Sequence, residues 1–224
     1  MTPLPSSDPR PIYLIGCGGH GRVVLDCLLV TGRIVAGIID AALPRGTLVH
    51  GIAVRGGDEQ LAQLEPRTSA VCIGVGVMPG TTRRAEIFAD CCRRGLQLVS
   101  VIHPSAVLSP RLELGEGVQV LAGALVQTGT RLGDNVIVNT AASVDHDCAL
   151  GRGVMIGPGA VLCGEVTIGA DAYIGAGAVI LPGVQIGADA IIGAGSVVIR
   201  DVASGVKVAG NPARTLGLPG DSHA

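Results

Sequence analysis

The sequence predicts two structures in one chain: a small α/β domain of Rossmann-like type, followed by an all-β parallel β-helix. In residues 102–203, Leu, Ile or Val recurs at every sixth position through seventeen consecutive blocks, from Ile102 to Val198. In residues 11–101, short apolar stretches alternate with helical ones, and the first apolar stretch runs into a glycine-rich turn. Alternating strands and helices are typical of a parallel sheet covered by helices.

The six-residue period is the basis for the β-helix. An amphipathic helix repeats every three to four residues and a half-buried strand every second residue, so neither has a period of six. A fixed internal period is typical of stacked repeats, and three blocks would make one triangular coil of eighteen residues. The first position of each block is aliphatic and the fifth is small or β-branched, and both are expected to point inward. Glycine is frequent at the second position, where it allows tight bends and close backbone approach.

Composition excludes several classes of function. The formal net charge of the 224 residues is −2, and the chain has two tyrosines, one phenylalanine and no tryptophan. No nucleic-acid partner is expected, because there is neither a basic surface nor a set of aromatic platforms for bases. The seven cysteines lack metal-binding or redox spacing and are expected to be reduced thiols of a cytoplasmic protein. No membrane span is expected, because the apolar residues 179–199 stay in the repeat and include Pro182 and Asp189.

We expect the α/β domain in residues 11–101, the β-helix in 102–203, and a C-terminal tail in 204–224 after the repeat stops at Ala203. Within the first domain, strands are expected in 11–16, 33–39, 52–54, 69–75 and 96–101, and helices in 22–30 and 81–94. Asp58 is expected to cap a short helix through Leu64, and Gly95 to end the second long helix. Ligands of such sheets bind beyond the carboxyl ends of the strands, where this sequence has residues 16–21, Asp40 and residues 74–76.

The glycine-rich turn predicts a site for a diphosphate. Gly16, Gly18 and Gly21 form a G-x-G-x-x-G pattern between a strand and a helix, and Asp40 follows at about the ribose-binding distance. Such a turn presents backbone N–H groups and a helix N-terminus to the ligand. NAD, a nucleotide sugar and an unused loop all remain open, but the short sheet and the absence of a hydride-transfer domain favour a nucleotide sugar. The residues expected to bind it are Gly18, Gly19, His20, Gly21, Asp40, Gly74 and Asn139.

The order of glycine turn, small α/β domain and unbroken six-residue repeat resembles the hexapeptide-repeat acetyltransferases that act on nucleotide-linked amino sugars, such as those that make bacillosamine and N-acetylperosamine. The resemblance implies a left-handed β-helix, a homotrimer, acetyl-CoA as co-substrate without a metal, and acetylation of the amine of a UDP- or GDP-linked 4-amino sugar. Its most specific local match is residues 139–148. There the resemblance makes His146 the general base and Asp147 the acid that orients it. A sugar or sialic acid O-acetyltransferase and a non-catalytic trimer that binds nucleotide sugars remain alternatives.

The chemistry of acetyl transfer also singles out His146. Attack of an amine on a thioester needs a group that removes a proton and donors for the oxyanion that develops. His146 occupies the third position of its block, a corner, and is therefore expected to project outward. Asp145 and Asp147 flank it, and either could hold the imidazole. Gly164 lies one coil further on, and its backbone N–H is expected to sit over the base and donate to the thioester carbonyl.

Coenzyme A is expected along the outside of the later coils, in a cleft between neighbouring subunits. We expect Ala176 and Ala194 to continue the corner column above Gly164 and to leave a smooth groove for the pantetheine arm. The tail is similar to the segment that follows the β-helix in CoA-dependent hexapeptide enzymes. That similarity makes Lys207 and Arg214 candidates for the 3′-phosphate. No group of residues has the spacing of a metal site.

Overall fold

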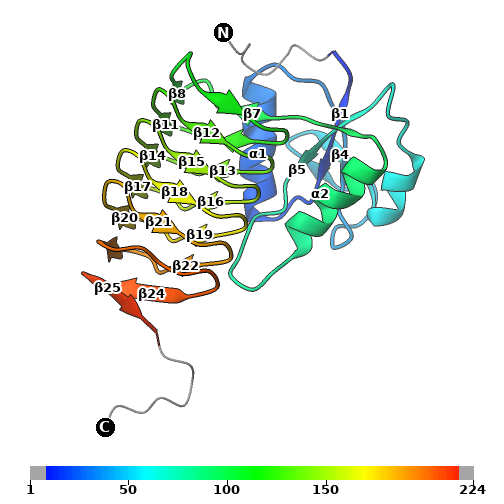
Figure 1. Ribbon diagram of the computed structural model, residues 1–224. Coiled ribbons are helices and arrows are strands. Elements are labelled where there is room, and N and C mark those ends of the chain that lie inside the picture. The colour runs from blue at the N-terminus through cyan, green and yellow to red at the C-terminus, as the bar shows by residue number, and fades with distance from the viewer. Residues whose placement is uncertain (1–8, 217–224) are drawn as a thin grey trace.

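The computed structural model describes residues 9–216 and contains the two predicted parts, an α/β domain and a left-handed β-helix (Figure 1). The α/β domain has a six-stranded sheet in the order β3-β4-β2-β1-β5-β6. All of its neighbouring strands are parallel except β3 and β4. Its elements are β1 (Ile12–Ile15), α1 (Gly19–Val30), β2 (Val35–Ile39), β3 (Leu48–Val49), β4 (Ile52–Gly56), the 3-10 helix η1 (Asp58–Gln63), β5 (Ala70–Ile73), α2 (Arg83–Arg93) and β6 (Gln97–Leu98).

The two helices cover opposite faces of this sheet. One buried cluster joins Leu14 of β1 to Leu25 of α1 and continues to Val101 at the start of the β-helix. The other joins Ile15 and Val71 to Phe88 of α2. Alternate residues of a strand point to opposite faces, so neighbours such as Leu14 and Ile15 serve the two clusters. As a result α1 lies between the sheet and the β-helix, as Figure 1 shows.

The β-helix is a triangular prism with three sheets, which we call faces 1, 2 and 3 in the order that the chain visits them. Each strand pairs with the strand eighteen residues earlier, as in Arg131 with Glu113, which confirms the predicted coil length. Face 1 has β7 (Val101–Ile102), β10 (Gln119–Val120), β13 (Ile137–Val138), β16 (Met155–Ile156), β19 (Tyr173–Ile174), β22 (Ile191–Ile192), β24 (Lys207–Gly210) and β25 (Ala213–Thr215). Face 2 has β8 (Val107–Leu108), β11 (Leu125–Val126), β14 (Ser143–Val144), β17 (Val161–Leu162), β20 (Val179–Ile180) and β23 (Val197–Val198). Face 3 has β9 (Glu113–Leu114), β12 (Arg131–Leu132), β15 (Ala149–Leu150), β18 (Thr167–Ile168) and β21 (Gln185–Ile186).

The interior of the prism is filled as the period predicts. One buried cluster runs along its length and is built from the aliphatic first positions and the small fifth positions of the blocks. The second-position glycines sit where coils stack most closely. A Cβ on Gly115, for example, would lie 2.5 Å from the backbone nitrogen of Asp134 in the next coil. Glycine fills this position throughout the corner between faces 3 and 1 and in the later coils at the corner between faces 1 and 2, whereas the corner between faces 2 and 3 has no glycine there.

Three expectations for the elements need correction. Asp58 does not cap the short helix: the N-cap is Gly57, and the Asp58 carboxylate pairs with Arg83 of α2 instead. The expected strand at 96–101 is divided into β6 of the α/β sheet and β7 of the first coil.

The coils also do not stop at Ala203. The strand β24 pairs with β22 in parallel at an offset of sixteen residues, Lys207 beside Ile191, so the last coil is two residues shorter than the others. Val208 of this strand is buried in the prism, and β25 then turns back antiparallel.

Candidate active site

His146 lies at the corner between faces 2 and 3, directly after β14, and its side chain is 49% exposed. Its Nδ1 is 2.9 Å from Oδ2 of Asp147. Strand alternation alone would direct neighbouring side chains to opposite sides. Asp147 has a φ of +57°, however, and this left-handed conformation at the corner turns its carboxylate back to the ring. The prism therefore presents an imidazole and a carboxylate as an outward-facing pair.

Asp145 takes a different part in the corner. Its Oδ1 accepts a hydrogen bond of 2.7 Å from the backbone N–H of His146, and its own carbonyl accepts one of 2.9 Å from the hydroxyl of Thr130. Asp145 thus fixes the backbone, whereas Asp147 contacts the ring. Gly129 lies beneath Asp147, and a Cβ there would overlap the carboxylate. Of the two acids that the sequence left open, the geometry brings Asp147 to the imidazole.

The Asp147 contact determines the chemistry of the ring. A carboxylate only accepts hydrogen bonds, so Nδ1 of His146 carries the proton and Nε2 carries the lone pair when the ring is neutral. The hydrogen bond that His146 donates to Asp147 raises the pKa of His146, and the charges of Asp145 and Glu165 add to this effect. The ring is therefore a stronger base than an ordinary histidine.

Gly164 lies directly beside this ring in the next coil, as the eighteen-residue spacing predicts. A Cβ on Gly164 would fall 2.5 Å from Nε2 and 2.6 Å from Cε1 of His146. Among residues 9–216, the backbone N–H of Gly164 has no hydrogen-bond acceptor, although its carbonyl accepts from Gly183. The corner therefore combines a basic nitrogen with a free backbone donor.

The prediction that Ala176 and Ala194 continue the corner column above Gly164 is wrong. Each face recurs every eighteen residues, so the corner of His146 and Gly164 continues to Pro182 and Arg200. Ala176 and Ala194 follow β19 and β22 and lie at the corner between faces 1 and 2. Sequence reasoning missed Arg200, an exposed cation three coils beyond His146, although counting in steps of eighteen would have found it.

Three other predicted residues also lie away from this corner. Asn139 follows β13 at the corner between faces 1 and 2, where its Oδ1 accepts from the backbone N–H of Thr140 at 2.8 Å. Lys207 and Arg214 lie on β24 and β25, which extend face 1 at the far end of the prism. Within one chain, the structure therefore brings His146, Asp147 and Gly164 together and places Asn139, Lys207 and Arg214 elsewhere.

The glycine turn lies at the carboxyl ends of β1 and β5, and its glycines have two different functions. The Cα atoms of Gly16, Gly21 and Gly74 are packed together: a Cβ on Gly21 would lie 3.0 Å from the carbonyl oxygen of Gly74 and would overlap that of Gly16. Gly18 and Gly19 face open space instead. Helix α1 begins at Gly19, three residues earlier than expected, and has no acidic residue in its first turn. Its N-terminus is therefore open to an anion.

Asp40 supports this turn from the end of β2. Its Oδ2 accepts a 2.6 Å hydrogen bond from the backbone N–H of Cys17, and its Oδ1 accepts from the N–H groups of Ala42 and Leu43 at 2.8 and 3.2 Å. Both carboxylate oxygens are thus engaged with backbone. Asp40 therefore orients the glycine turn.

The His20 ring turns toward the β-helix. Its Nε2 is 2.8 Å from Oε1 of Gln119 on β10, and its Cβ and Cγ pack against Gly76. Burial, together with the nearby Arg84 cation, lowers the pKa of His20 to about 4, so the ring is neutral at neutral pH. His20 therefore joins the glycine turn to the β-helix, a contact that the sequence did not predict.

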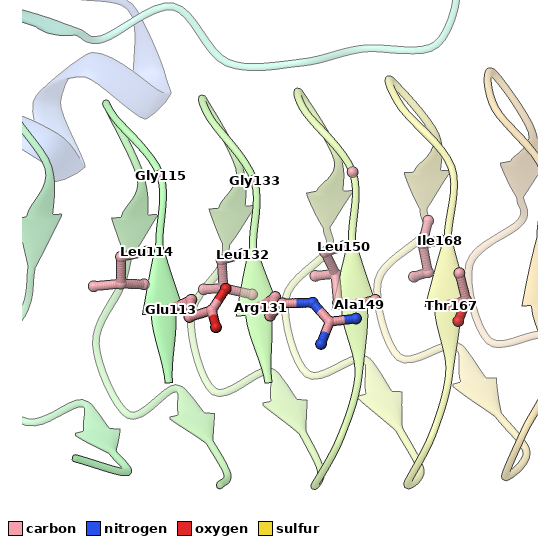
Figure 2. Close-up of a pocket in the computed structure, with 11 residues that line it drawn as sticks. Glu113, Leu114, Gly115, Arg131, Leu132, Gly133, Ala149, Leu150, Thr167 and Ile168 are labelled. Carbon is pink, nitrogen blue, oxygen red and sulfur yellow. The ribbon is translucent and has the colours of Figure 1, made fainter. Parts of the chain in front are cut away.

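The outer surface of face 3 carries a shallow, open hollow of about 530 Å³ (Figure 2). Glu113, Arg131, Ala149 and Thr167 line it from four successive strands, and Figure 2 shows Arg131 reaching toward the strand of Ala149. No predicted site residue lines this hollow. Its other lining residues include Gly115, Gly133 and Gly151 at the corner between faces 3 and 1, and it follows the surface of a single sheet.

Comparison with known proteins agrees with this architecture. The family described as the PglD N-terminal domain matches residues 11–88, and the bacterial transferase hexapeptide family matches residues 165–200. No curated protein matches the chain. A crystal structure of perosamine N-acetyltransferase from Caulobacter crescentus, in complex with CoA and GDP-perosamine, is 40% identical and has a TM-score of 0.86. The match covers 92% of this chain and 97% of that one.

The chain belongs to the hexapeptide-repeat sugar acetyltransferase family. A second relative is the acetyltransferase domain of PglB from Neisseria gonorrhoeae, solved in complex with acetyl coenzyme A. It is 38% identical to this acetyltransferase, with a TM-score of 0.85 and coverage of 92% of this chain and 99% of the other. WeeI from Acinetobacter baumannii is 26% identical, with a TM-score of 0.74 over 92% of this chain and 100% of its own.

Two negative findings apply to residues 9–216 of this acetyltransferase. No helix there is long and apolar enough to cross a membrane. Nor does that part of the chain bring three or more His, Cys, Asp or Glu side chains into a group that could hold a metal ion.

Proposed function

We propose that this protein transfers the acetyl group of acetyl-CoA to the amine of a 4-amino sugar linked to GDP or UDP. The observation that supports this most directly is the His146–Asp147 pair packed against Gly164 on an outward corner of the β-helix. The relative from Caulobacter crescentus was solved with CoA and GDP-perosamine, and in one of its structures a single histidine is replaced by asparagine. Acyl transfer in this family thus agrees with the chemistry that the corner offers.

In the proposed reaction, Nε2 of His146 removes a proton as the sugar amine attacks the thioester carbonyl. Asp147 holds Nδ1–H and stabilises the imidazolium that forms. The free N–H of Gly164 donates to the oxyanion of the tetrahedral intermediate. When the intermediate collapses, the C–S bond breaks, coenzyme A leaves as its thiol after receiving the proton, and the amide remains on the sugar.

The nucleotide diphosphate would bind at the N-terminus of α1. Gly18 and Gly19 face open space there, and the first turn of α1 has no carboxylate to repel an anion. Gly21 and Gly74 would contribute by letting β1, α1 and β5 approach closely. On this proposal residues 11–101 bind the nucleotide and the coils that follow carry the acetyl transfer.

Coenzyme A would extend from His146 along the column of Gly164, Pro182 and Arg200. Successive coils are about 4.8 Å apart, so three coils place Arg200 about 14 Å from the base along the prism. That exposed guanidinium is a candidate partner for a phosphate of coenzyme A. Lys207 and Arg214 remain candidates only if the cofactor crosses to face 1, where those residues lie.

We also propose that the active unit is a homotrimer in which another copy of the chain covers face 2. Apart from Ser143, the outward side chains of this face form an apolar stripe beside the His146 corner, with Val107 and Val161 exposed and Leu125, Val179 and Val197 partly exposed. Face 1 differs, because its outward residues Gln119, Ile137 and Met155 are already buried within one chain, and the outward residues of face 3 are largely polar. Exposed apolar stripes of this kind are typical of subunit interfaces. The free cysteines fit a reducing compartment such as the cytoplasm.

The deciding experiment is an assay of purified protein with acetyl-CoA and GDP- or UDP-linked 4-amino sugars, following thiol release. His146→Ala should lower kcat by about 10²- to 10⁴-fold, the usual cost of losing a general base. The matched control is His103→Ala at another corner, where Nδ1 bonds only the hydroxyl and N–H of Ser105. A hydroxyl-bearing sugar acetylated in preference to any amine would indicate O-acetylation. Nucleotide binding without turnover on either class would indicate a non-catalytic role.

A further inference from the structure

Gln119 is a fully buried polar side chain at the junction of the two domains. It lies on β10 of face 1, and its exposed fraction is 0%. Buried amides are expensive unless each polar atom has a partner. All of the partners of this amide belong to the α/β domain: Ile73, Cys72 and His20. The residue therefore connects the β-helix to the end of β5 and to the glycine turn.

The contact with Ile73 determines the orientation of the Gln119 amide. Its Nε2 lies 2.6 Å from the carbonyl oxygen of Ile73, which can only accept a hydrogen bond. The other hydrogen of this NH₂ group faces Sγ of Cys72 at 3.7 Å. A flipped amide would place two acceptor oxygens together, so Oε1 must face His20. The 2.8 Å contact between Oε1 and Nε2 of His20 is therefore a hydrogen bond that His20 donates.

The ring of His20 then has only one state at neutral pH. Burial lowers its pKa to about 4, and the buried Arg84 cation acts in the same direction. A neutral imidazole carries a single N–H, and Gln119 holds it at Nε2. Nδ1 consequently carries a lone pair, and among residues 9–216 it has no hydrogen-bond partner. The ring thus offers an acceptor at Nδ1. The oxygens of a diphosphate are acceptors too, so Nδ1 cannot form a hydrogen bond with them.

We propose that Gln119 is a positioning residue: it holds His20 in the Nε2–H tautomer so that Nδ1 accepts a hydrogen bond from a hydroxyl of the bound sugar nucleotide. This inference rests on the proposed function, which places the nucleotide sugar at the glycine turn. The diphosphate is left to the backbone N–H groups of Gly18 and Gly19 and to the N-terminus of α1. His20 and the glycines then recognise different parts of one ligand.

The surrounding contacts show that the amide can be changed without losing the junction. The carbonyl of Ile73 also accepts a 3.0 Å hydrogen bond from Nη1 of Arg84, and the same Nη1 donates to the carbonyl of Val75 at 2.7 Å. Removing the Gln119 amide leaves this second set of bonds in place. In Gln119→Leu, the end of β5 therefore keeps its connection to α2, while His20 loses the group that selects its tautomer.

The tautomer can be measured without any activity. In protein labelled with ¹⁵N-histidine, two-bond ¹H–¹⁵N correlations should show the His20 ring with a protonated Nε2 and an unprotonated Nδ1, unchanged between about pH 6 and pH 8. The signals of this ring should be absent from His20→Gln, which assigns them, and altered in Gln119→Leu. Ile137→Val is the matched control, because Ile137 is the buried neighbour of Gln119 on β13 and does not bond His20. A protonated Nδ1, or a charged ring at neutral pH, would overturn the inference.

Ligand binding tests the second half of the proposal. Gln119→Leu should raise KM for the nucleotide sugar about tenfold, which is the scale of one lost hydrogen bond. Both kcat and KM for acetyl-CoA should stay within about twofold of the wild-type values. Nucleotide sugars that each lack one ribose or sugar hydroxyl should identify a single hydroxyl whose removal weakens binding to the wild type and not to His20→Leu. Pyrophosphate should compete equally well for both proteins. Weaker competition by pyrophosphate in His20→Leu, or no hydroxyl coupled to His20, would refute it.

This design separates the inference from the proposed function. The tautomer is a property of the free protein, so it can be found even if no amine is acetylated. Conversely, efficient acetylation by a protein whose His20 carries its proton on Nδ1 would leave the proposed function intact and remove the role given to Gln119.

Discussion

The imidazole of His146 occupies the space that a side chain on Gly164 would need, since a Cβ there would lie 2.5 Å from Nε2. His146 and Gly164, eighteen residues apart, are thus stacked in neighbouring coils, and the absence of a side chain on Gly164 leaves room for the His146 ring. Gly164 does not have a φ in the left-handed region, so its backbone accepts alanine. The three atoms nearest to such a Cβ all belong to the His146 ring.

Gly164→Ala should therefore displace the His146 ring and lower kcat/KM by about 10²-fold, because small displacements of a reacting group cost rate steeply. Stability should change little, because alanine already occupies the same position of the block at other corners, as in Ala170. The measurements are steady-state kinetics and thermal unfolding. Ala170→Gly, which changes one methyl group at the corner between faces 3 and 1, is the control and should keep full activity. Normal kinetics for Gly164→Ala would show that the ring has another productive position.

Asp147→Asn should shift the pH profile. The base works in its neutral form, so kcat/KM falls as pH decreases through the pKa of His146, which the Asp147 hydrogen bond raises. Removing the carboxylate charge lowers that pKa, so the acidic limb should move to lower pH. At the same time kcat should fall by about tenfold to a hundredfold, less than for loss of the base.

Asp145→Asn is the matched control for that profile. It removes a neighbouring charge but keeps an oxygen that can accept from the N–H of His146, and it does not touch the ring. Its acidic limb should move less, and its kcat should stay close to that of the wild type. An equal shift in both variants would mean that net charge, and not the 2.9 Å contact, sets the pKa.

Arg200→Gln should raise KM for acetyl-CoA about tenfold or more, the effect of losing a hydrogen bond to a charged group, and leave KM for the nucleotide sugar unchanged. The comparison to make is with Lys207→Gln and Arg214→Gln, using both CoA and dephospho-CoA as product inhibitors. Wild-type protein should be inhibited more strongly by CoA than by dephospho-CoA. The cation that binds the 3′-phosphate is the one whose replacement abolishes this difference. If that cation is Lys207 or Arg214, the cofactor crosses to face 1 instead of following the His146 column.

Val161→Glu should disrupt the proposed trimer. Val161 is 37% exposed on face 2, stacked on Ser143 in the coil of His146, so a carboxylate there would be buried against a second copy of the chain. Sedimentation velocity should show smaller species, and activity should fall with the loss of the trimer. Ile34→Glu is the control, because Ile34 is 66% exposed just before β2, at the end of the sheet opposite the glycine turn. An intact trimer of Val161→Glu would exclude face 2 as the interface.

The stacking of the coils follows closely from the sequence. The two exceptions each have a simple cause. The six-residue period alone makes His146 and Gly164 vertical neighbours, because parallel coils of equal length keep a constant register. The prediction that Ala176 and Ala194 share this column is wrong because Ala176 is twelve residues beyond Gly164. Three faces recur in each coil, so a step of twelve leads to a different corner. The last coil has sixteen residues, and its short turn has no repeat signature.

From the sequence alone one could obtain the two domains, the coil length, the inward residues and the outward histidine, because these follow from local spacing and from the burial of aliphatic side chains. Only the tertiary structure decided which acid contacts His146, since that depends on a single left-handed residue at a corner. It alone also revealed the bond between His20 and Gln119, which lie 99 positions apart in the chain. Periodic spacing determines neighbours within one repeat array. Contacts between domains depend on how two surfaces distant in the sequence pack together, and no local pattern encodes that packing.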